Sequence, residues 1–427
     1  MNSDLTGHWS TPRPCPTPRT GWCRAARLLG ALFFAAAVVA CGGGDSSAGK
    51  WVAAWYTSPE PADIQILGVT ARPFNNETLR QTAIVTASGK SLRVRLSNRY
   101  GATAVQIGGI RIARAGAAGS IASGTDKPLL FSGSEAVAIA PLSEVVSDPV
   151  AFDVAAGDQL SISLYMPGSV PTPTWHWLAI QTSYIAPGNQ LSAQTLINPS
   201  TSTSFHVLTG VDVESSAAQR TIALIGDSLT DGVGSSLDAQ KRYPDALFAR
   251  LLAAGKGMSV VNAGIATNRL LHDIVAPSLL NRLDADALDA PGVSHVAVLV
   301  GVNDLGVPGW LNRPGEVVTT EQLIGGLTEI ARRAHAKNQK AFVATITPFN
   351  GFAAPGYYSD AAEAKRQVVN AWIRTNTVFD GVFDFDAVVR DPNDISKIRA
   401  AFDSGDHLHP NDLGYAAMAN SIDLNRF

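Results

Sequence analysis

Four short segments in the second half of the chain carry side chains that could together hydrolyse an ester. They are Gly226–Ser228, Asn262–Arg269, Gly301–Asp304 and Asp406–Pro410. Acyl transfer needs a nucleophile, a base that takes its proton, a group that orients the base, and donors for the developing oxyanion. The four segments contain a candidate for each of these roles.

Ser228 is the candidate nucleophile and His409 the candidate base. Asp406 lies three residues before that histidine, so it can accept a hydrogen bond from the imidazole and hold its tautomer. The side-chain amide of Asn303, with backbone N–H groups near Ser228 and in the second segment, could bind the oxyanion. A Gly-Asp-Ser turn alone is common by chance, so the prediction of catalysis depends on the coincidence of all four segments.

Parallel strands are the elements that must position these segments. From residue 220 onward, apolar runs alternate with helical segments, which predicts a parallel sheet covered by helices on both faces. The predicted strands are Thr221–Ile225, Ser259–Asn262, Val296–Gly301, Ala341–Ile346 and Gly381–Phe385, and the predicted helices are Tyr243–Ala254, Thr320–Asn338, Ala361–Asn376 and Asn411–Asn420. The first three segments lie at the carboxyl ends of predicted strands, where such folds bind their ligands.

The first half of the chain has a different pattern. Between Trp51 and about Ala218, apolar and polar residues alternate with period two, and turn residues interrupt the runs. The clearest runs contain Leu92, Val94 and Leu96, Ile110 and Ile112, and Leu160, Ile162, Leu164 and Met166. This pattern predicts antiparallel sheets, and we expect an all-β sandwich or jelly-roll domain at residues 50–218 and an α/β domain at 219–427.

Composition and charge exclude several classes of function. Apolar residues make up 46% of the chain and charged residues 16%, which allows a large core. The net charge of −3 and the lack of a basic run argue against a general nucleic-acid binder. We propose no metal site, because His272, His295 and His335 lack partners at ligand spacing. The ester chemistry described above needs no cofactor.

The N-terminal segment has the features of an export signal. Leu28–Ala40 is a 13-residue apolar run behind Arg24 and Arg27. It is too short to cross a membrane comfortably and suits the apolar core of a secretory signal. The sequence therefore predicts export across a bacterial inner membrane.

The three cysteines, Cys15, Cys23 and Cys41, all lie in this N-terminal segment, so the rest of the chain folds without disulfides or thiol chemistry. Small residues precede Cys41 and the glycine-rich run Gly42–Gly49 follows it, which resembles a bacterial lipoprotein signal. The resemblance implies a signal at 1–41, a flexible tether at 42–49 and a lipid-anchored protein, periplasmic or at the cell surface. Ordinary cleavage before Cys41, without lipidation, is the alternative.

The four segments resemble the sequence blocks of the SGNH (GDSL) hydrolase superfamily, which read Gly-Asp-Ser, a glycine-bearing turn, Gly-x-Asn-Asp and Asp-x-x-His. The resemblance extends from about Thr221 to the end of the chain. It implies a flavodoxin-like sheet and hydrolysis of carboxylic esters without a cofactor. It also implies that Ser228 is the nucleophile, Asn303 an oxyanion donor, Asp406 the orienting carboxylate and His409 the base.

One position departs from the family pattern. The oxyanion glycine of the second block usually stands five residues after the asparagine, where this chain has Thr267. A β-branched residue at positive φ would be strained. Thr267 could donate its N–H from an ordinary conformation, or Gly264 could take over part of the role, and we favour Thr267.

The first half resembles the N-terminal β-domain of bacterial SGNH proteins grouped with aryl and acetylxylan esterases, through Trp51–Trp55, Thr78–Gln81 and Thr174–Trp177. The resemblance implies an ester substrate such as an acetylated glycan or a small aryl ester. A lipase-like or phospholipase-like esterase of longer acyl esters, a catalytically weak polysaccharide-binding protein and an acyltransferase are the alternatives. Trp175 and Trp177 should share one face of a strand, either in the core or exposed for stacking.

Several neighbours of the candidate residues are expected to be structural. Asp227 should hydrogen-bond within its own turn, Asp231 is a turn residue by default, and Asp304 should cap or buttress the loop that contains it. His407 is expected in the pocket or at the surface rather than as the base. Asn268–Arg269 could either touch the substrate or stabilise their loop.

Overall fold

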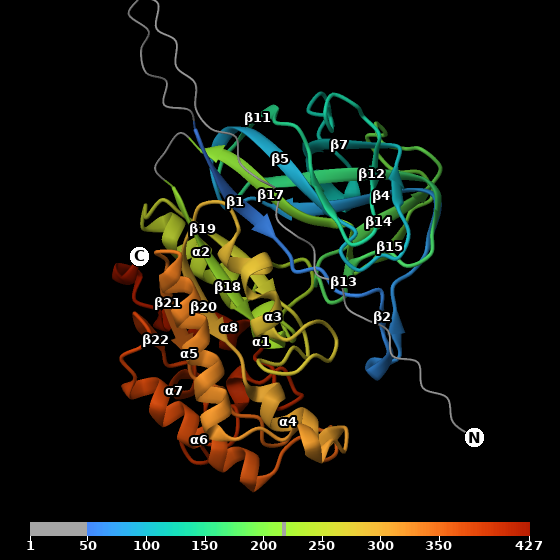
Figure 1. Cartoon of the computed structure of the whole chain (residues 1–427). Coiled ribbons are helices and arrows are strands. Elements are labelled where there is room, and N and C mark those ends of the chain that lie inside the picture. Colours follow the sequence, from blue (N-terminus) through green and yellow to red (C-terminus); the bar gives the residue numbers. More distant parts are fainter. Residues whose placement is uncertain (1–48, 216–218) are drawn as a thin grey trace, which may run out of the picture. The chain divides into compact units, whose positions relative to one another are not determined.

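The parallel sheet predicted for the second half of the chain is present in the computed structural model, which describes residues 49–215 and 219–427 (Figure 1). Its strands are β18 (Arg220–Gly226), β19 (Met258–Gly264), β20 (Val293–Leu299), β21 (Lys340–Ala344) and β22 (Gly381–Phe383). They are all parallel and follow the order β19-β18-β20-β21-β22. This is the flavodoxin-like order, whose switch point lies between the first and third strands, β18 and β20.

Helices connect and cover these strands. They are α1 (Ser228–Asp231), α2 (Tyr243–Ala253), α3 (Leu279–Leu283), α4 (Val302–Trp310), α5 (Thr320–Ala336), α6 (Asp360–Thr375), α7 (Phe385–Val389) and α8 (Asp412–Ser421). The four predicted helices are confirmed to within two residues at each end. The sequence did not predict α1, α3, α4 and α7. In α4, Gly306, Pro308 and Gly309 hide the helical pattern because glycine and proline disfavour helix interiors.

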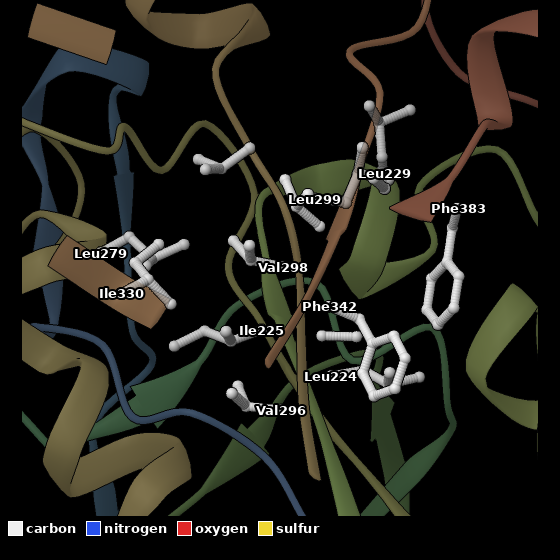
Figure 2. Packing of buried hydrophobic residues seen from close by; sticks show 14 of the residues in the cluster. Leu224, Ile225, Leu229, Leu279, Val296, Val298, Leu299, Ile330, Phe342 and Phe383 are labelled. Atoms are coloured by element: carbon white, nitrogen blue, oxygen red, sulfur yellow. The ribbon is translucent and has the colours of Figure 1, made fainter. Parts of the chain in front are cut away.

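The core of this half forms between the sheet and its helices. Ile222–Gly226 of β18 and Val296–Leu299 of β20 are all apolar and buried, as expected for strands covered on both faces. Figure 2 shows Leu279 of α3 and Ile330 of α5 near Ile225 of the sheet. Helix α2 packs against α8, whereas α5 packs against α3 and α6. Each large apolar side chain buried in this way contributes roughly 1.5–3 kcal/mol of hydrophobic free energy.

The first half is the predicted sandwich of two antiparallel sheets. One sheet contains β1 (Lys50–Tyr56), β17 (Leu208–Ser215), β5 (Gly89–Ser97), β10 (Glu144–Val146) and β11 (Val150–Val154). The other contains β15 (Ser200–Ser202), β14 (Ser183–Pro187), β4 (Phe74–Ile84), β12 (Gln159–Val170), β7 (Gly109–Arg114) and β8 (Lys127–Leu129). The alternating apolar residues predicted from the sequence are buried in one cluster between the sheets.

Three two-stranded ribbons complete the β-rich half. They are β2 (Asp63–Ile64) with β3 (Val69–Thr70), β6 (Val105–Ile107) with β9 (Val137–Ile139), and β13 (Trp175–His176) with β16 (Phe205–His206). The last of these ribbons approaches the α/β half, because the ring of His176 contacts Asp231 in α1.

The sandwich and the α/β half are joined within one compact unit, Ser47–Phe427. Strand β1 contacts β19, and the carbonyl oxygen of Ala53 accepts hydrogen bonds from the hydroxyls of Thr221 (3.1 Å) and Ser259 (2.6 Å). The hydroxyl of Thr86 donates to the carbonyl of Val260 in β19 (2.9 Å). The boundary predicted between residues 218 and 219 adjoins residues outside the described ones and stays a prediction.

The predicted signal segment with Cys41, and all but the last residue of the predicted tether at 42–49, lie outside the described residues. Lipidation and export therefore stay predictions. Among the residues that are described, no helix has the length and apolar character needed to cross a membrane.

Candidate active site

A tight turn places Ser228 at the carboxyl edge of the sheet. Strand β18 ends at Gly226, where a Cβ atom would lie 2.3 Å from the carbonyl oxygen of Leu299, so only glycine fits. Asp227 then caps α1, because its carboxylate accepts a hydrogen bond from the N–H of Leu229 (3.0 Å). This is the role predicted for Asp227, and its complete burial raises its pKa to about 7.

The structure joins Ser228, His409 and Asp406 in one chain of hydrogen bonds. The Oγ atom of Ser228 lies 2.8 Å from Nε2 of His409, and Nδ1 of His409 lies 2.5 Å from Oδ2 of Asp406. The other oxygen of Asp406 accepts the backbone N–H groups of Leu408 (2.9 Å) and His409 (2.8 Å). A histidine held in this way carries its proton on Nδ1 and can accept one from the serine at Nε2.

The electrostatics of Asp406 suit an orienting carboxylate. Partial burial by itself would raise the pKa of Asp406, but the hydrogen bonds and charge of His409 and the backbone donors outweigh it. The pKa of Asp406 therefore lies well below its ordinary value, and the carboxylate stays ionised at any pH at which the protein is expected to work.

His407 lies outside this arrangement. Its side chain is exposed, and its Nδ1 atom lies 2.6 Å from a carboxylate oxygen of Asp403. His407 has a left-handed backbone (φ 67°). His407 was predicted to lie either in the pocket or at the surface, and it lies at the surface.

Asn303 lies on the first turn of α4 with both ends of its amide engaged. Its Nδ2 atom donates to the carbonyl of Asn268 (3.0 Å), and its Oδ1 atom accepts from the hydroxyl of Tyr357 (2.7 Å). One N–H of the amide is left to bind an oxyanion. The sequence did not point to Tyr357, because it belongs to no motif and approaches Asn303 from a loop 54 residues further along the chain.

Thr267, which stands where the family has its oxyanion glycine, differs from both expectations. Thr267 does not adopt an ordinary conformation, because its φ is 64°, in the left-handed region. Gly264 does not share the role, because its N–H donates to Oδ1 of Asn262 (2.8 Å). A Cβ atom at Gly264 would also lie 2.2 Å from the backbone nitrogen of Asp231, so this glycine serves close packing. Within residues 49–215 and 219–427, the N–H of Thr267 donates to no acceptor.

Replacing Thr267 with glycine is expected to raise the free energy of unfolding by about 1 kcal/mol, because glycine adopts positive φ without strain. The donor is a backbone N–H, so kcat should change less than about threefold. Urea unfolding and ester hydrolysis measure the two effects, with Thr267→Ala as a control that keeps part of the strain. A tenfold loss of kcat in the glycine variant would show instead that the threonine side chain takes part.

The loop around Thr267 is fastened by residues from several elements. The carboxylate of Asp304 accepts the N–H groups of Leu270 (2.7 Å) and Leu271 (3.2 Å). Asp304 therefore does not cap α4, one of its two predicted roles; its carboxylate instead fastens the first turn of α4 to Leu270 and Leu271, directly after the second segment. Of the two roles considered for Asn268–Arg269, the structure supports stabilisation of their loop. The side chain of Asn268 donates to the carbonyl of Pro277 (2.9 Å).

The reacting groups open into a cavity of about 180 Å³. Apart from Ser228, Asn303, Thr267 and His409, its lining consists of Leu67, Trp177, Leu178, Val233, Ala266, Trp310, Phe352, Tyr357 and Leu408. Apolar and aromatic side chains thus surround the serine, and no carboxylate, lysine or arginine is among the lining residues. Three of the lining residues, Leu67, Trp177 and Leu178, come from the β-rich half.

The two tryptophans pack on the same apolar cluster. Trp175 is buried in it and donates from its indole to the carbonyl of Pro61 (2.7 Å). Trp177 is partly buried against this cluster and also lines the cavity. Core packing therefore holds fully for Trp175, whereas Trp177 combines partial packing with exposure to the cavity.

Residues 224–417 match the model of the GDSL-like lipase/acylhydrolase family. No match was found among curated proteins.

Solved structures similar to this chain include an alpha/beta hydrolase enzyme from the metagenome of Lake Arreo, with 21% identity, a TM-score of 0.37, and coverage of 47% of this chain and 92% of that one. An acetyl xylan esterase from Geobacillus stearothermophilus matches with 18% identity, a TM-score of 0.37, and the same coverages of 47% and 92%. A GDSL-like lipase from Bacteroides thetaiotaomicron matches with 15% identity, a TM-score of 0.36, and coverages of 47% and 84%.

The family match covers the end of the strand that leads to Ser228, the loop of Thr267, the turn of Asn303 and the segment of His409. The parallel sheet around these segments has the strand order expected for that fold. The part of the chain that carries the candidate site thus belongs to the GDSL-like lipase/acylhydrolase family within the SGNH superfamily, and the protein is a carboxylic ester hydrolase.

Proposed function

We propose that the protein cleaves esters through an acyl-serine intermediate formed on Ser228. The hydroxyl proton of Ser228 passes to Nε2 of His409 as Oγ attacks the ester carbonyl carbon. The resulting oxyanion accepts hydrogen bonds from the Asn303 amide and from the backbone N–H groups of Ser228 and Thr267. Asp406 stabilises the imidazolium that forms.

The intermediate then collapses and the alcohol leaves with the proton from His409, so that the acyl group stays on Ser228. A water molecule attacks the acyl carbon and gives a proton to the same nitrogen. The second collapse releases the carboxylic acid and restores the serine hydroxyl. The observation that carries this proposal is the unbroken hydrogen-bond chain from Asp406 through His409 to Ser228 at the floor of an apolar cavity.

The cavity favours esters whose acyl or aryl group is small and uncharged. Drug-sized ligands occupy pockets of roughly 300–1,000 Å³, so the cavity of about 180 Å³ can enclose only a smaller group. Aromatic side chains such as Trp177, Trp310 and Phe352 provide apolar contact for that group. Short-acyl and aryl esters are therefore the proposed substrates, in preference to lipids with long acyl chains.

A panel of p-nitrophenyl esters of increasing acyl length tests this function. We expect kcat/KM to be highest for the shortest acyl groups and to fall at least tenfold for long ones. Trp310→Ala, which removes part of the cavity wall, should move the optimum toward longer chains. Trp372→Ala removes a half-buried tryptophan from α6 instead and should leave the profile unchanged.

Two outcomes would count against the proposal. If none of the esters is hydrolysed, the proposed function fails. If long acyl chains are hydrolysed as well as acetate, the esterase function stands but the substrate class is wrong.

A further inference from the structure

A histidine of the β-rich half reaches the helix that carries Ser228. The Nε2 atom of His176, in β13, lies 3.0 Å from Oδ1 of Asp231, the last residue of α1. Both side chains are buried, with 4% and 5% of their surface exposed. Asp231 was expected to be an ordinary turn residue, but it binds the ring of His176 beneath the proposed nucleophile.

The partners of His176 require a charged imidazole. Its Nδ1 atom lies 3.0 Å from the carbonyl oxygen of Ser58, and its Nε2 atom faces the carboxylate of Asp231. A carbonyl oxygen and a carboxylate only accept hydrogen bonds, whereas a neutral imidazole has one N–H to donate. Both bonds form together when the ring is protonated at both nitrogens.

The pKa of His176 agrees with this geometry. Burial alone would lower it, but the charge and hydrogen bond of Asp231, with the nearby Glu60, outweigh burial and raise it. Deprotonation would leave one of the two acceptors without its hydrogen bond.

Three other charged side chains, Glu60, Arg282 and Arg242, lie around this pair. Glu60 has a carboxylate oxygen 3.4 Å from Nδ1 of His176, and burial raises the pKa of Glu60 to about 7. The guanidinium of Arg282, from α3, donates to the Ser58 hydroxyl (3.0 Å) and to the carbonyl of Gly226 (2.8 Å). Arg242 lines the small cavity that also borders His176 and Asp231. The cluster therefore spans both halves of the molecule at the base of α1.

Helix α1 depends on such contacts for its position. It has only four residues, and helices this short are not stable by themselves. Backbone hydrogen bonds connect Asp231, at the end of α1, to the start of the helix near Ser228. The N–H of Asp231 donates to the carbonyl of Asp227 (2.9 Å), and the N–H of Gly232 donates to that of Ser228 (2.8 Å). Among the described residues, Oδ2 of Asp231 has no hydrogen-bond partner, so His176 holds this carboxylate through Oδ1.

We propose that His176 is a positioning residue of the esterase site: by binding Asp231, it holds α1 so that the hydroxyl of Ser228 stays within reach of His409. The inference rests on the proposed function of Ser228. With Trp177, the next residue, which lines the cavity, His176 would then give the β-rich half a direct part in the active site.

Two conservative variants separate the two hydrogen bonds of the ring. The amide of His176→Gln can place a donor where Nε2 stood and keep the bond to Asp231, whereas His176→Asn can keep only the bond to Ser58. We expect the glutamine variant to retain kcat within about threefold. The asparagine and alanine variants should lose about 10- to 100-fold in kcat, with KM little changed, because a small displacement of a nucleophile is costly.

The pH dependence gives a second readout. Below the raised pKa of His176 the charged ring donates to both Ser58 and Asp231; as the pH rises through that pKa, the ring loses its charge attraction to Asp231 and can keep only one of the two hydrogen bonds. Wild-type kcat should therefore fall on the alkaline side. The glutamine variant, whose amide does not titrate, should lack that fall.

A matched control is available on the partner strand β16. His206 is also buried, pairs with Trp175 across the ribbon, and has no hydrogen bond from its ring within the part of the chain that the structure describes. His206→Gln should change thermal stability without changing kcat or its pH profile. Labelling of Ser228 by a fluorophosphonate should slow in parallel with kcat in the His176 variants only.

The inference is overturned if the glutamine variant is as impaired as the asparagine variant, or if all His176 variants lose stability while kcat and labelling stay at the wild-type level. Either result would make His176 a fold-stabilising residue only. Failure of the proposed function is a separate result, because it would appear as hydrolysis that survives the loss of Ser228 itself.

Discussion

Replacing Ser228 with alanine is expected to lower kcat by on the order of 10⁶-fold, the loss typical of removing a catalytic serine. The reason lies in the geometry: Oγ of Ser228 is the atom that His409 contacts at 2.8 Å, and the cavity opens directly onto it. Residual hydrolysis would come from the remaining oxyanion donors and from substrate binding. Hydrolysis of p-nitrophenyl acetate by the purified protein measures the effect.

The control is Ser236→Ala, which removes an exposed hydroxyl that donates to Asp412 and should leave kcat unchanged. Mass spectrometry of the wild type, quenched during turnover, should find an acetyl group on the peptide that contains Ser228. Substantial hydrolysis by Ser228→Ala, or an acyl group trapped on another residue, would contradict the mechanism.

Replacing Asn303 with alanine should lower kcat about 10²–10³-fold with little change in KM, because oxyanion donors act mainly in the transition state. The amide is held at both ends, by the carbonyl of Asn268 and the hydroxyl of Tyr357. Its free N–H is therefore preorganised and does not need to reorient during the reaction. Steady-state kinetics with a short-acyl ester separate the effect on kcat from that on KM.

Tyr357→Phe tests the role of Asn303 indirectly, by removing the hydroxyl that holds its amide in place. It leaves Oδ1 of Asn303 without its partner, and we expect a loss of several-fold in kcat, smaller than that of Asn303→Ala. Asn393→Ala, at an exposed position in the loop after α7, is the control and should have wild-type kinetics. If Asn303→Ala raises KM and leaves kcat unchanged, Asn303 binds the ground state and is not an oxyanion donor.

The predicted strands and helices of the α/β half match the structure closely. Parallel strands that are buried on both faces consist of continuous apolar residues, which the sequence shows directly. Loss of this local signal explains the elements that were missed. Helix α4 contains Gly306, Pro308 and Gly309, and α1 has only four residues. Propensity and periodicity cannot identify such elements, since neighbouring elements hold them in place.

The same division applies to the site. Ser228, Asn303, Asp406 and His409 could be selected because their residue types and spacing follow the requirements of acyl transfer, and parallel strands end at a common edge of the sheet. Tyr357, His176 and the cavity wall were not predicted, because their roles arise from contacts between segments far apart in the chain. The backbone angle of Thr267 was mispredicted for a related reason, since the loop around it imposes the conformation.

The sequence by itself determined which groups react, because the nucleophile, base, carboxylate and amide donor are set by residue type and by the order of strands and helices. It also determined that a sandwich precedes the catalytic part. Only the tertiary structure decided how the β-rich half takes part: Leu67, Trp177 and Leu178 line the cavity, and His176 contacts Asp231 beneath Ser228. These contacts depend on the packing of two separately patterned halves, which no local sequence pattern encodes.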